Sequence, residues 1–109
     1  MQRHGSVLGL SAEGKAEYRR LHAEVWPGVL RKITECGIRN YSIFLKEPEN
    51  LLFSYFEYHG ADFAADMAKM AEDPETQRWW AVCMPLQRPL ETRAEGEWWA
   101  EMIEVFHHD

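Results

Sequence analysis

NYSIFLKEPENLLFSYFEY, residues 40–58, holds two runs of strand-forming residues on either side of a short polar segment. Aromatic and branched aliphatic side chains dominate both runs, and these residue types favour strands. The segment KEPEN between them has the length and the turn-forming residues of a hairpin loop. The sequence therefore predicts two antiparallel strands, at residues 40–45 and 51–58.

A helical pattern precedes this hairpin, over residues 11–36. At about 100° per residue its apolar side chains fall in one stripe, and the charged side chains lie outside that stripe. Pro27 predicts a kink or a restart near Trp26, because proline lacks the N–H that a continuous helix requires. Ser11 is the predicted N-cap, and Gly37 is predicted to end the helix in the left-handed region.

A second helical region follows the hairpin. Residues 60–71 and 74–82 both have helical patterns. Asp73 followed by Pro74 is a typical N-cap and first helical residue. We therefore expect a second helix in two segments, with the second segment starting at Pro74.

The two ends of the chain predict the remaining strands. Residues 1–10 are strand-like although glycine interrupts them, and residues 84–97 contain prolines and glycine and are predicted to be a loop. For residues 98–102 a helical turn is the alternative to a strand. The last strand is predicted around three apolar residues, Ile103, Val105 and Phe106.

The predicted order of elements, β-α-β-β-α-β, is that of a ferredoxin-like α+β fold, an antiparallel sheet with its helices on one face. The central hairpin is apolar on both sides, since Tyr41 and Ile43 point one way and Phe44 the other. Helices on one side leave the second face uncovered. That face is expected to line a pocket or to contact a partner subunit; a plain surface with a few aromatic residues is the alternative.

Size and charge limit the functional classes. The 109 residues, 46% of them hydrophobic, fit a single domain over residues 1–109. A net charge of −6 without a basic block argues against nucleic acid or an anionic membrane as a partner. No apolar run is long enough to span a membrane. Cys36 and Cys83 are isolated, which predicts reduced thiols and a cytoplasmic protein.

Three side chains at intervals of four residues, Tyr18, His22 and Trp26, occupy the apolar stripe of the first helix. His22 could be a core histidine bonded to a backbone carbonyl, or an acid-base group that exchanges protons near neutral pH. Tyr18 lies one turn away, so that its phenol and the imidazole can converge on one small ligand. Trp26 is interpreted as a core aromatic residue.

Two pairs of tryptophans stand out in the second half of the chain. Trp79 and Trp80 point about 100° apart on a helix, so that one can join the core while the other stacks on a sugar ring. Trp98 and Trp99 are candidates for an interface. His107 and His108 have no third ligand at a metal-binding spacing and give only a weak zinc signal.

The strings EYRRLHAEVWP, NYSIFL, NLLF, QRWW and EVF occur in this order over nearly the whole chain, which thereby resembles the L-rhamnose mutarotase family. The resemblance implies a homodimer of the dimeric α/β-barrel type that interconverts the anomers of a 6-deoxy-hexose. It also implies His22 as proton donor and four substrate-binding residues. These are Tyr18, Tyr41, Trp79 and Trp80.

The implied reaction requires an acid and a base but no cofactor and no metal. L-Rhamnose is the expected substrate, and L-fucose or a related sugar is the alternative. The base is left open between Tyr18, a carboxylate and an ordered water. A cofactor-free oxygenase or a ligand-binding protein on the same dimeric scaffold is the competing class, because one fold supports many functions.

Overall fold

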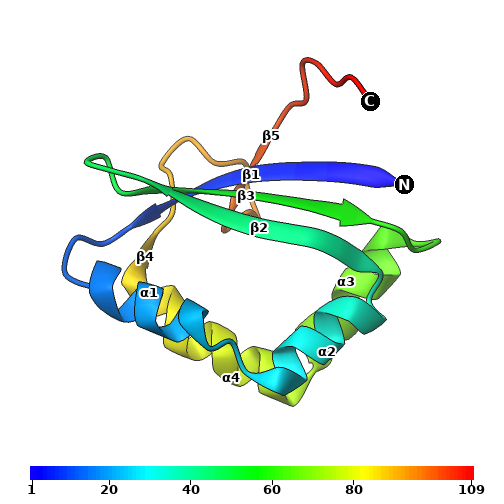
Figure 1. Cartoon of the computed structure of the whole chain (residues 1–109), viewed down its shortest axis with the longest axis horizontal. Helices are drawn as coiled ribbons and strands as arrows, with labels where there is room; N and C mark the ends of the chain where they lie inside the picture. Colours follow the sequence, from blue (N-terminus) through cyan, green and yellow to red (C-terminus); the bar gives the residue numbers. More distant parts are fainter.

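Four helices cover one face of a five-stranded antiparallel sheet, and the opposite face carries no helix (Figure 1). A computed structural model of the chain describes all residues from Met1 to Asp109. The elements, in chain order, are β1 (Gln2–Leu10), α1 (Lys15–Ala23), α2 (Pro27–Glu35), β2 (Ile38–Lys46), β3 (Leu51–Tyr58), α3 (Phe63–Glu72), α4 (Pro74–Cys83), a 3₁₀ helix (Met84–Leu86), β4 (Gln87–Arg88) and β5 (Ala100–Met102).

The sheet has the strand order β2-β3-β1-β4, and β5 also pairs with β1. The predicted hairpin is confirmed, with Ile43 opposite Ser54 and Phe44 opposite Phe53. A bulge between Arg39 and Ser42 adds residues to β2, and Asn40 takes up the irregularity with a φ of 51°. The ferredoxin-like order β-α-β-β-α-β is thereby confirmed, with each helix divided in two.

The first helix restarts at the proline, as predicted. Trp26 is extended, with φ −60° and ψ 134°, and Pro27 is the first residue of α2. Gly37 has a φ of +84° and ends α2 in the left-handed region, which is also confirmed. The prediction for Ser11 is wrong in position, because α1 starts only at Lys15. The Ser11 hydroxyl accepts the Gly14 N–H at 2.9 Å and stabilises the turn that precedes the helix.

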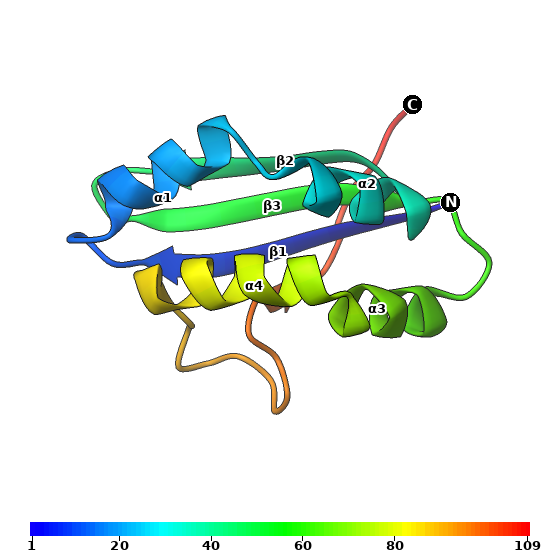
Figure 2. The same ribbon diagram turned by 90° about the horizontal axis from the view of Figure 1, so that it is seen from below.

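Helix α4 begins at the predicted cap. Asp73 Oδ2 accepts the Thr76 N–H at 2.9 Å and the Thr76 hydroxyl at 2.8 Å, and Pro74 is the first residue of α4. Seen from the helical side, α1 and α2 lie along β2 and β3, whereas α3 and α4 lie along β1 (Figure 2). The four α-helices have only nine or ten residues each, so none of them could span a membrane.

Two predictions near the C-terminus are wrong. The segment 84–97 is not all loop, because Gln87 pairs with Leu10 and makes β4. The last strand is Ala100–Met102, which pairs with Gly5–Val7, and the predicted strand around Ile103, Val105 and Phe106 is absent. The edge of β1 that β4 leaves open accepts residues 100–102, so the apolar residues beyond them have no partner, and Ile103 is 89% exposed.

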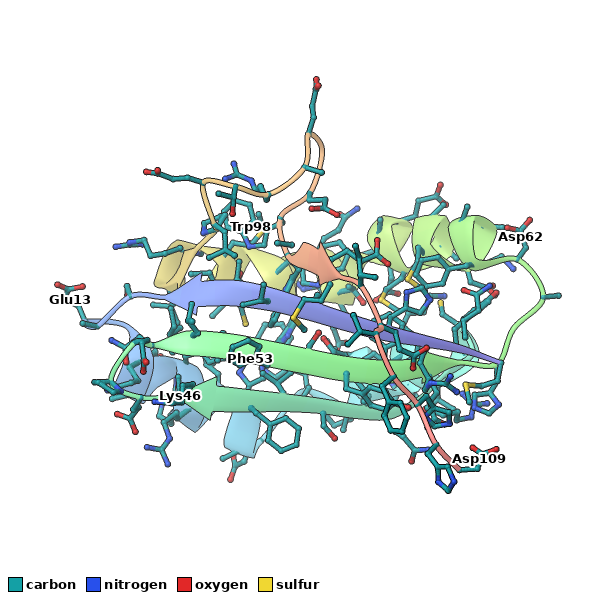
Figure 3. All side chains as sticks on the ribbon, turned by 90° about the horizontal axis from the view of Figure 1, so that it is seen from above. Glu13, Lys46, Phe53, Asp62, Trp98 and Asp109 are labelled. Atoms are coloured by element: carbon teal, nitrogen blue, oxygen red, sulfur yellow. The ribbon has the colours of Figure 1, made fainter.

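The hydrophobic core lies between the sheet and the helices. Leu8, Leu10 and Leu52 point from the sheet into this core and are almost fully buried. On the opposite face Phe44 is 65% exposed. The chain after β5 runs across this uncovered face to Asp109 (Figure 3), and Arg3 Nε donates to Glu104 Oε1 at 2.6 Å.

Candidate functional site

A pocket of about 300 Å³ opens between α1 and the sheet. Pockets that bind small ligands start at about this volume, so that a monosaccharide is a suitable occupant. Four lining residues come from α1, and four aliphatic residues from the strands form the other wall. The lining residues are Leu10, Tyr18, Arg19, His22, Ala23, Ile43, Leu45 and Leu52.

His22 lines the pocket, and only one of its ring nitrogens has a hydrogen-bond partner in the protein. Its Nδ1 lies 2.9 Å from the Tyr18 backbone carbonyl, one helical turn earlier. A carbonyl oxygen only accepts hydrogen bonds, so Nδ1 carries the proton, and Nε2 of the neutral ring holds a lone pair. Burial lowers the pKa of His22, although the bond to the Tyr18 carbonyl partly opposes this change. At neutral pH the imidazole is therefore uncharged, and its free lone pair lies on Nε2.

A row of aromatic rings positions His22 between α1 and α4, within the helical layer. Tyr18 stacks on its ring with the centroids 4.1 Å apart, and Trp79 of α4 approaches it edge-on at 5.1 Å. Trp26 also meets Trp79 edge-on, with the ring centroids 5.1 Å apart. Because neighbours on both sides hold the imidazole, its orientation is fixed before a ligand arrives.

Tyr18 is 4% exposed, and its hydroxyl accepts a hydrogen bond from Gln87 Nε2 at 3.4 Å. Burial raises the pKa of Tyr18 far above its ordinary value, and the Gln87 bond opposes this rise. The phenol therefore keeps its proton over the whole neutral range. It can donate a hydrogen bond to a ligand, but it is a poor proton source.

Tyr41 lies on the helical side of β2, next to Phe56, with a distance of 5.6 Å between ring centroids. Tyr41 is 41% exposed as a residue. Desolvation of its phenol raises the pKa of Tyr41 to about 12. Charge on Tyr41 would raise the pKa of Tyr18 further.

The adjacent tryptophans of α4 separate as their positions on the helix predict. Trp79 is 6% exposed and belongs to the core, whereas Trp80 is 38% exposed and makes no ring contact. Of the predicted site residues, only Tyr18 and His22 line the pocket. Trp79 packs beside His22 from α4 and Tyr41 lies on β2, but Tyr41, Trp79 and Trp80 do not line the pocket.

Two residues around the site, Arg19 and Gln87, had not been singled out in the sequence, and Trp98, a candidate for an interface, contacts Gln87. Arg19 lines the pocket, although its charge excluded it from the apolar stripe of the helix. Gln87 is 7% exposed and bonds Tyr18, but it lies in a segment predicted to be loop. Trp98 donates to Gln87 Oε1 at 2.7 Å. Trp98 and Trp99 both pack against the core.

The histidines outside the site form no metal centre. His107 lies 2.8 Å from the Asp109 carboxylate. Nowhere in the chain do three or more His, Cys, Asp or Glu side chains gather in an arrangement that could hold a metal ion.

Two solved structures share this fold. An L-rhamnose mutarotase from Formosa agariphila superposes with a TM-score of 0.80 and 21% identity over all of both chains. The tetracenomycin F2 cyclase of Streptomyces glaucescens superposes with a TM-score of 0.70 and 16% identity, again over all of both chains. At these identities the likeness shows the fold, which supports more than one chemistry.

Sequence relatives narrow the assignment. A protein of Oceanobacillus iheyensis named L-rhamnose mutarotase is 31% identical over 109 residues, which is the whole of both chains. One of Mesorhizobium japonicum with the same name is 34% identical over 98% of this chain and 96% of its own. The family model for L-rhamnose mutarotase (rhaM) matches residues 3–108. The chain belongs to the L-rhamnose mutarotase family.

Proposed function

We propose that this protein is a sugar mutarotase that interconverts the α and β anomers of a 6-deoxy-hexose, with L-rhamnose as its substrate. Membership of the family supports the reaction class. The observation that carries the proposal is the pocket beside α1, where His22 holds Nε2 free because Nδ1 is bonded to the Tyr18 carbonyl. Residues 1–109 are proposed to act as one mutarotase domain.

His22, expected from the resemblance to be the proton donor, is proposed to exchange the proton of the anomeric hydroxyl, as the base on ring opening and as the donor on closure. On ring opening, neutral Nε2 takes that proton, and the O–H electron pair becomes the second bond of an aldehyde carbonyl. The bond between the anomeric carbon and the ring oxygen breaks, and its electron pair stays on the ring oxygen, which takes up a proton. Closure on the other face of the aldehyde reverses each step, and the imidazolium then acts as the proton donor.

The proton for the ring oxygen is proposed to come from a water molecule in the pocket. No carboxylate lines the pocket, and burial raises the pKa of Tyr18 so far that the phenol does not release its proton. Tyr18 would instead donate a hydrogen bond as charge develops on the sugar oxygen. The reaction proceeds slowly in water, so an acceleration of about 10²–10⁴-fold from acid-base catalysis is sufficient.

The aliphatic wall of the pocket supports a deoxy sugar. Ile43, Leu45 and Leu52 present only hydrocarbon to the space beside His22. A methyl group at the sixth carbon can bury against them without loss of a hydrogen bond, whereas a hydroxymethyl group would leave its hydroxyl without a partner. Tyr18, Tyr41, Trp79 and Trp80 are proposed to bind the sugar, and the exposed indole of Trp80 would reach it only at the rim.

The uncovered sheet face is proposed to pair two copies of the chain. Phe44 and Phe53 are directly opposite each other on β2 and β3, and both point away from the helices. Val7 also belongs to this face, since it is opposite Phe53. Burial of such a surface against a second copy would remove it from water, which supports a homodimer.

A cytoplasmic location is proposed from the cysteines. Cys36 and Cys83 are both free and buried. Burial raises the pKa of Cys83 to about 11, so this thiol remains protonated and unreactive at neutral pH. Free thiols are usual where the compartment is reducing.

The direct test is saturation-transfer NMR on a mixture of anomers. Saturation of the α anomeric proton of L-rhamnose should transfer to the β signal much faster with the purified protein than in buffer alone. L-Fucose and D-glucose serve as comparisons for the sugar. Acceleration restricted to L-fucose would transfer the assignment to that sugar, and no acceleration for any of the three would refute the mutarotase proposal.

A further inference from the structure

Two hydrogen bonds in series connect the loop after β4 to the pocket. The Trp98 indole Nε1 donates to Gln87 Oε1 at 2.7 Å, and Gln87 Nε2 donates to the Tyr18 hydroxyl at 3.4 Å. Gln87 is 7% exposed and Tyr18 is 4% exposed, so water does not compete for either bond. The three residues come from β4, α1 and the segment before β5.

The indole of Trp98 decides which atom donates and which accepts in both hydrogen bonds. An indole N–H can only donate, so the Gln87 atom that meets it must be the carbonyl oxygen. The amide nitrogen then faces Tyr18, and an NH₂ group only donates, so the phenol oxygen must be the acceptor. The Tyr18 proton therefore points away from Gln87, and no protein group accepts it.

We infer that Gln87 and Trp98 are positioning residues that hold the Tyr18 hydroxyl with its proton directed to the ligand in the pocket. The inference rests on the proposed mutarotase function and adds a device for orienting one of its binding groups. Without Trp98 the Gln87 amide could rotate by 180°, its oxygen would then accept the Tyr18 proton, and the sugar oxygen would lose its donor. Because a buried glutamine is costly unless its polar atoms are bonded, this residue is a poor choice merely to fill space.

The first test replaces the donor at the start of the series. Trp98→Phe keeps an aromatic ring but removes the indole N–H, and Trp99→Phe is the matched control, since Trp99 also packs against the core but has no bond to Gln87. Saturation-transfer NMR should show L-rhamnose exchange slowed roughly tenfold in Trp98→Phe, about the value of one hydrogen bond, and little changed in Trp99→Phe. Equal rates in the two variants would overturn the inference.

Gln87→Glu provides a second test, which does not depend on whether the Trp98→Phe variant folds. An ionised carboxylate at this position accepts from both neighbours, so it would draw the Tyr18 proton away from the pocket. The protonated acid can still accept from Trp98 and donate to Tyr18, as the amide does. The ratio of variant to wild-type rate should therefore rise as the pH falls. A ratio that is independent of pH would contradict the assigned direction, because a merely structural glutamine would give a constant loss.

A Tyr18→Phe background separates this inference from the proposed function. With the phenol absent, Gln87→Glu and Trp98→Phe should slow exchange no further, since both act through Tyr18. Additive losses would refute the series. The ¹⁵N–¹H resonance of the Trp98 indole gives a readout without sugar, and it should shift in Gln87→Glu but not in Trp99→Phe. Failure of the wild-type protein to exchange anomers would refute the function, whereas an unmoved indole resonance would refute only the series.

Discussion

The properties of His22 follow from one backbone carbonyl and from its burial. The bond from Nδ1 to the Tyr18 carbonyl selects the tautomer, and burial lowers the pKa, so that the resting ring is neutral with a free Nε2. A histidine bonded in this way also fits the alternative of a core residue. Activity and stability must therefore be measured on the same variants to separate the two roles.

Replacement of His22 should separate binding from turnover. His22→Asn keeps a polar side chain that can bond the Tyr18 carbonyl, so the fold and sugar affinity should change little. Exchange should fall toward the uncatalysed rate, a loss of about 10²–10⁴-fold. Saturation-transfer NMR and a thermal melt of the same sample provide the two measurements. Wild-type exchange in a folded His22→Asn protein would show that His22 is a structural residue.

The pH dependence of activity has a definite sign. Because burial lowers the pKa of His22, the neutral form, which is the form proposed to act, dominates at pH 7, and the rate should fall only when the pH drops below the ordinary histidine value of about 6.5. A pH–rate profile with its ionisation above pH 7 would contradict the assignment of that ionisation to His22.

Stability should change with pH in the same direction. Since the folded pKa lies below the unfolded value of about 6.5, the unfolded chain binds the proton first, and the free energy of unfolding falls as the pH drops from there toward the folded pKa. Urea unfolding between pH 7.5 and 5 should show this loss, and the loss should be smaller in His22→Gln. Equal pH dependence in the two proteins would assign the loss to other groups.

The elements of the helical layer depend on a few backbone positions. Pro27 and Gly37 mark the two ends of α2, and this helix carries Val29 into the core. Trp26, just before α2, contacts Trp79 and so connects the helix to the row of rings around His22. Substitutions that disturb the C-terminal end of α2 should therefore also lower the stability of the site.

Gly37→Ala should destabilise the protein more than Gly96→Ala does. Both glycines have a φ of +84°, a conformation that costs a non-glycine residue about 1–3 kcal/mol. A Cβ on Gly37 would also lie 3.0 Å from the Gly60 backbone nitrogen, whereas a Cβ on Gly96 meets nothing within 4 Å. Chemical unfolding of the two variants should show this difference. Equal losses would mean that the Gly60 segment moves without cost.

At the scale of the whole molecule the uncovered sheet face is the main open surface. Helices cover only one side of the sheet, and the opposite side presents Phe44, Phe53 and the segment after β5 (Figure 3). Three apolar residues of that segment are at least 80% exposed, which is unusual for a chain that stays monomeric. They are Ile103, Val105 and Phe106.

Phe44→Lys should therefore convert a dimer to a monomer. A charge at this position would be buried without a partner in the paired state. Light scattering at micromolar concentration should give twice the chain mass for the wild-type protein and a single chain mass for the variant. Val82→Lys, on the exposed side of α4, is the control and should leave the dimer intact. A monomeric wild-type protein would refute the pairing, although each chain would still hold its own pocket.

The amino-acid sequence by itself determined the features that depend on short-range chemistry. The hairpin at residues 40–58 followed from two runs of strand-forming residues around a turn segment, the restart of the helix from Pro27, and the start of α4 from Asp73 and Pro74. Each of these signals acts within a few residues, so no distant contact is required to interpret it. The same holds for the four-residue spacing that brings Tyr18 beside His22.

Only the tertiary structure decided the short strands, the choice between Trp79 and Trp80, and the partners of Tyr18. Strands of two or three residues are too short for an alternating pattern to be detected in the sequence. β4 and β5 form because the edge of β1 is open to them. Trp79 rather than Trp80 turns inward because α4 lies along β1. Gln87 and Tyr18 are 69 positions apart in the sequence, so the hydrogen bond between them forms only when folding of the sheet brings the two residues together.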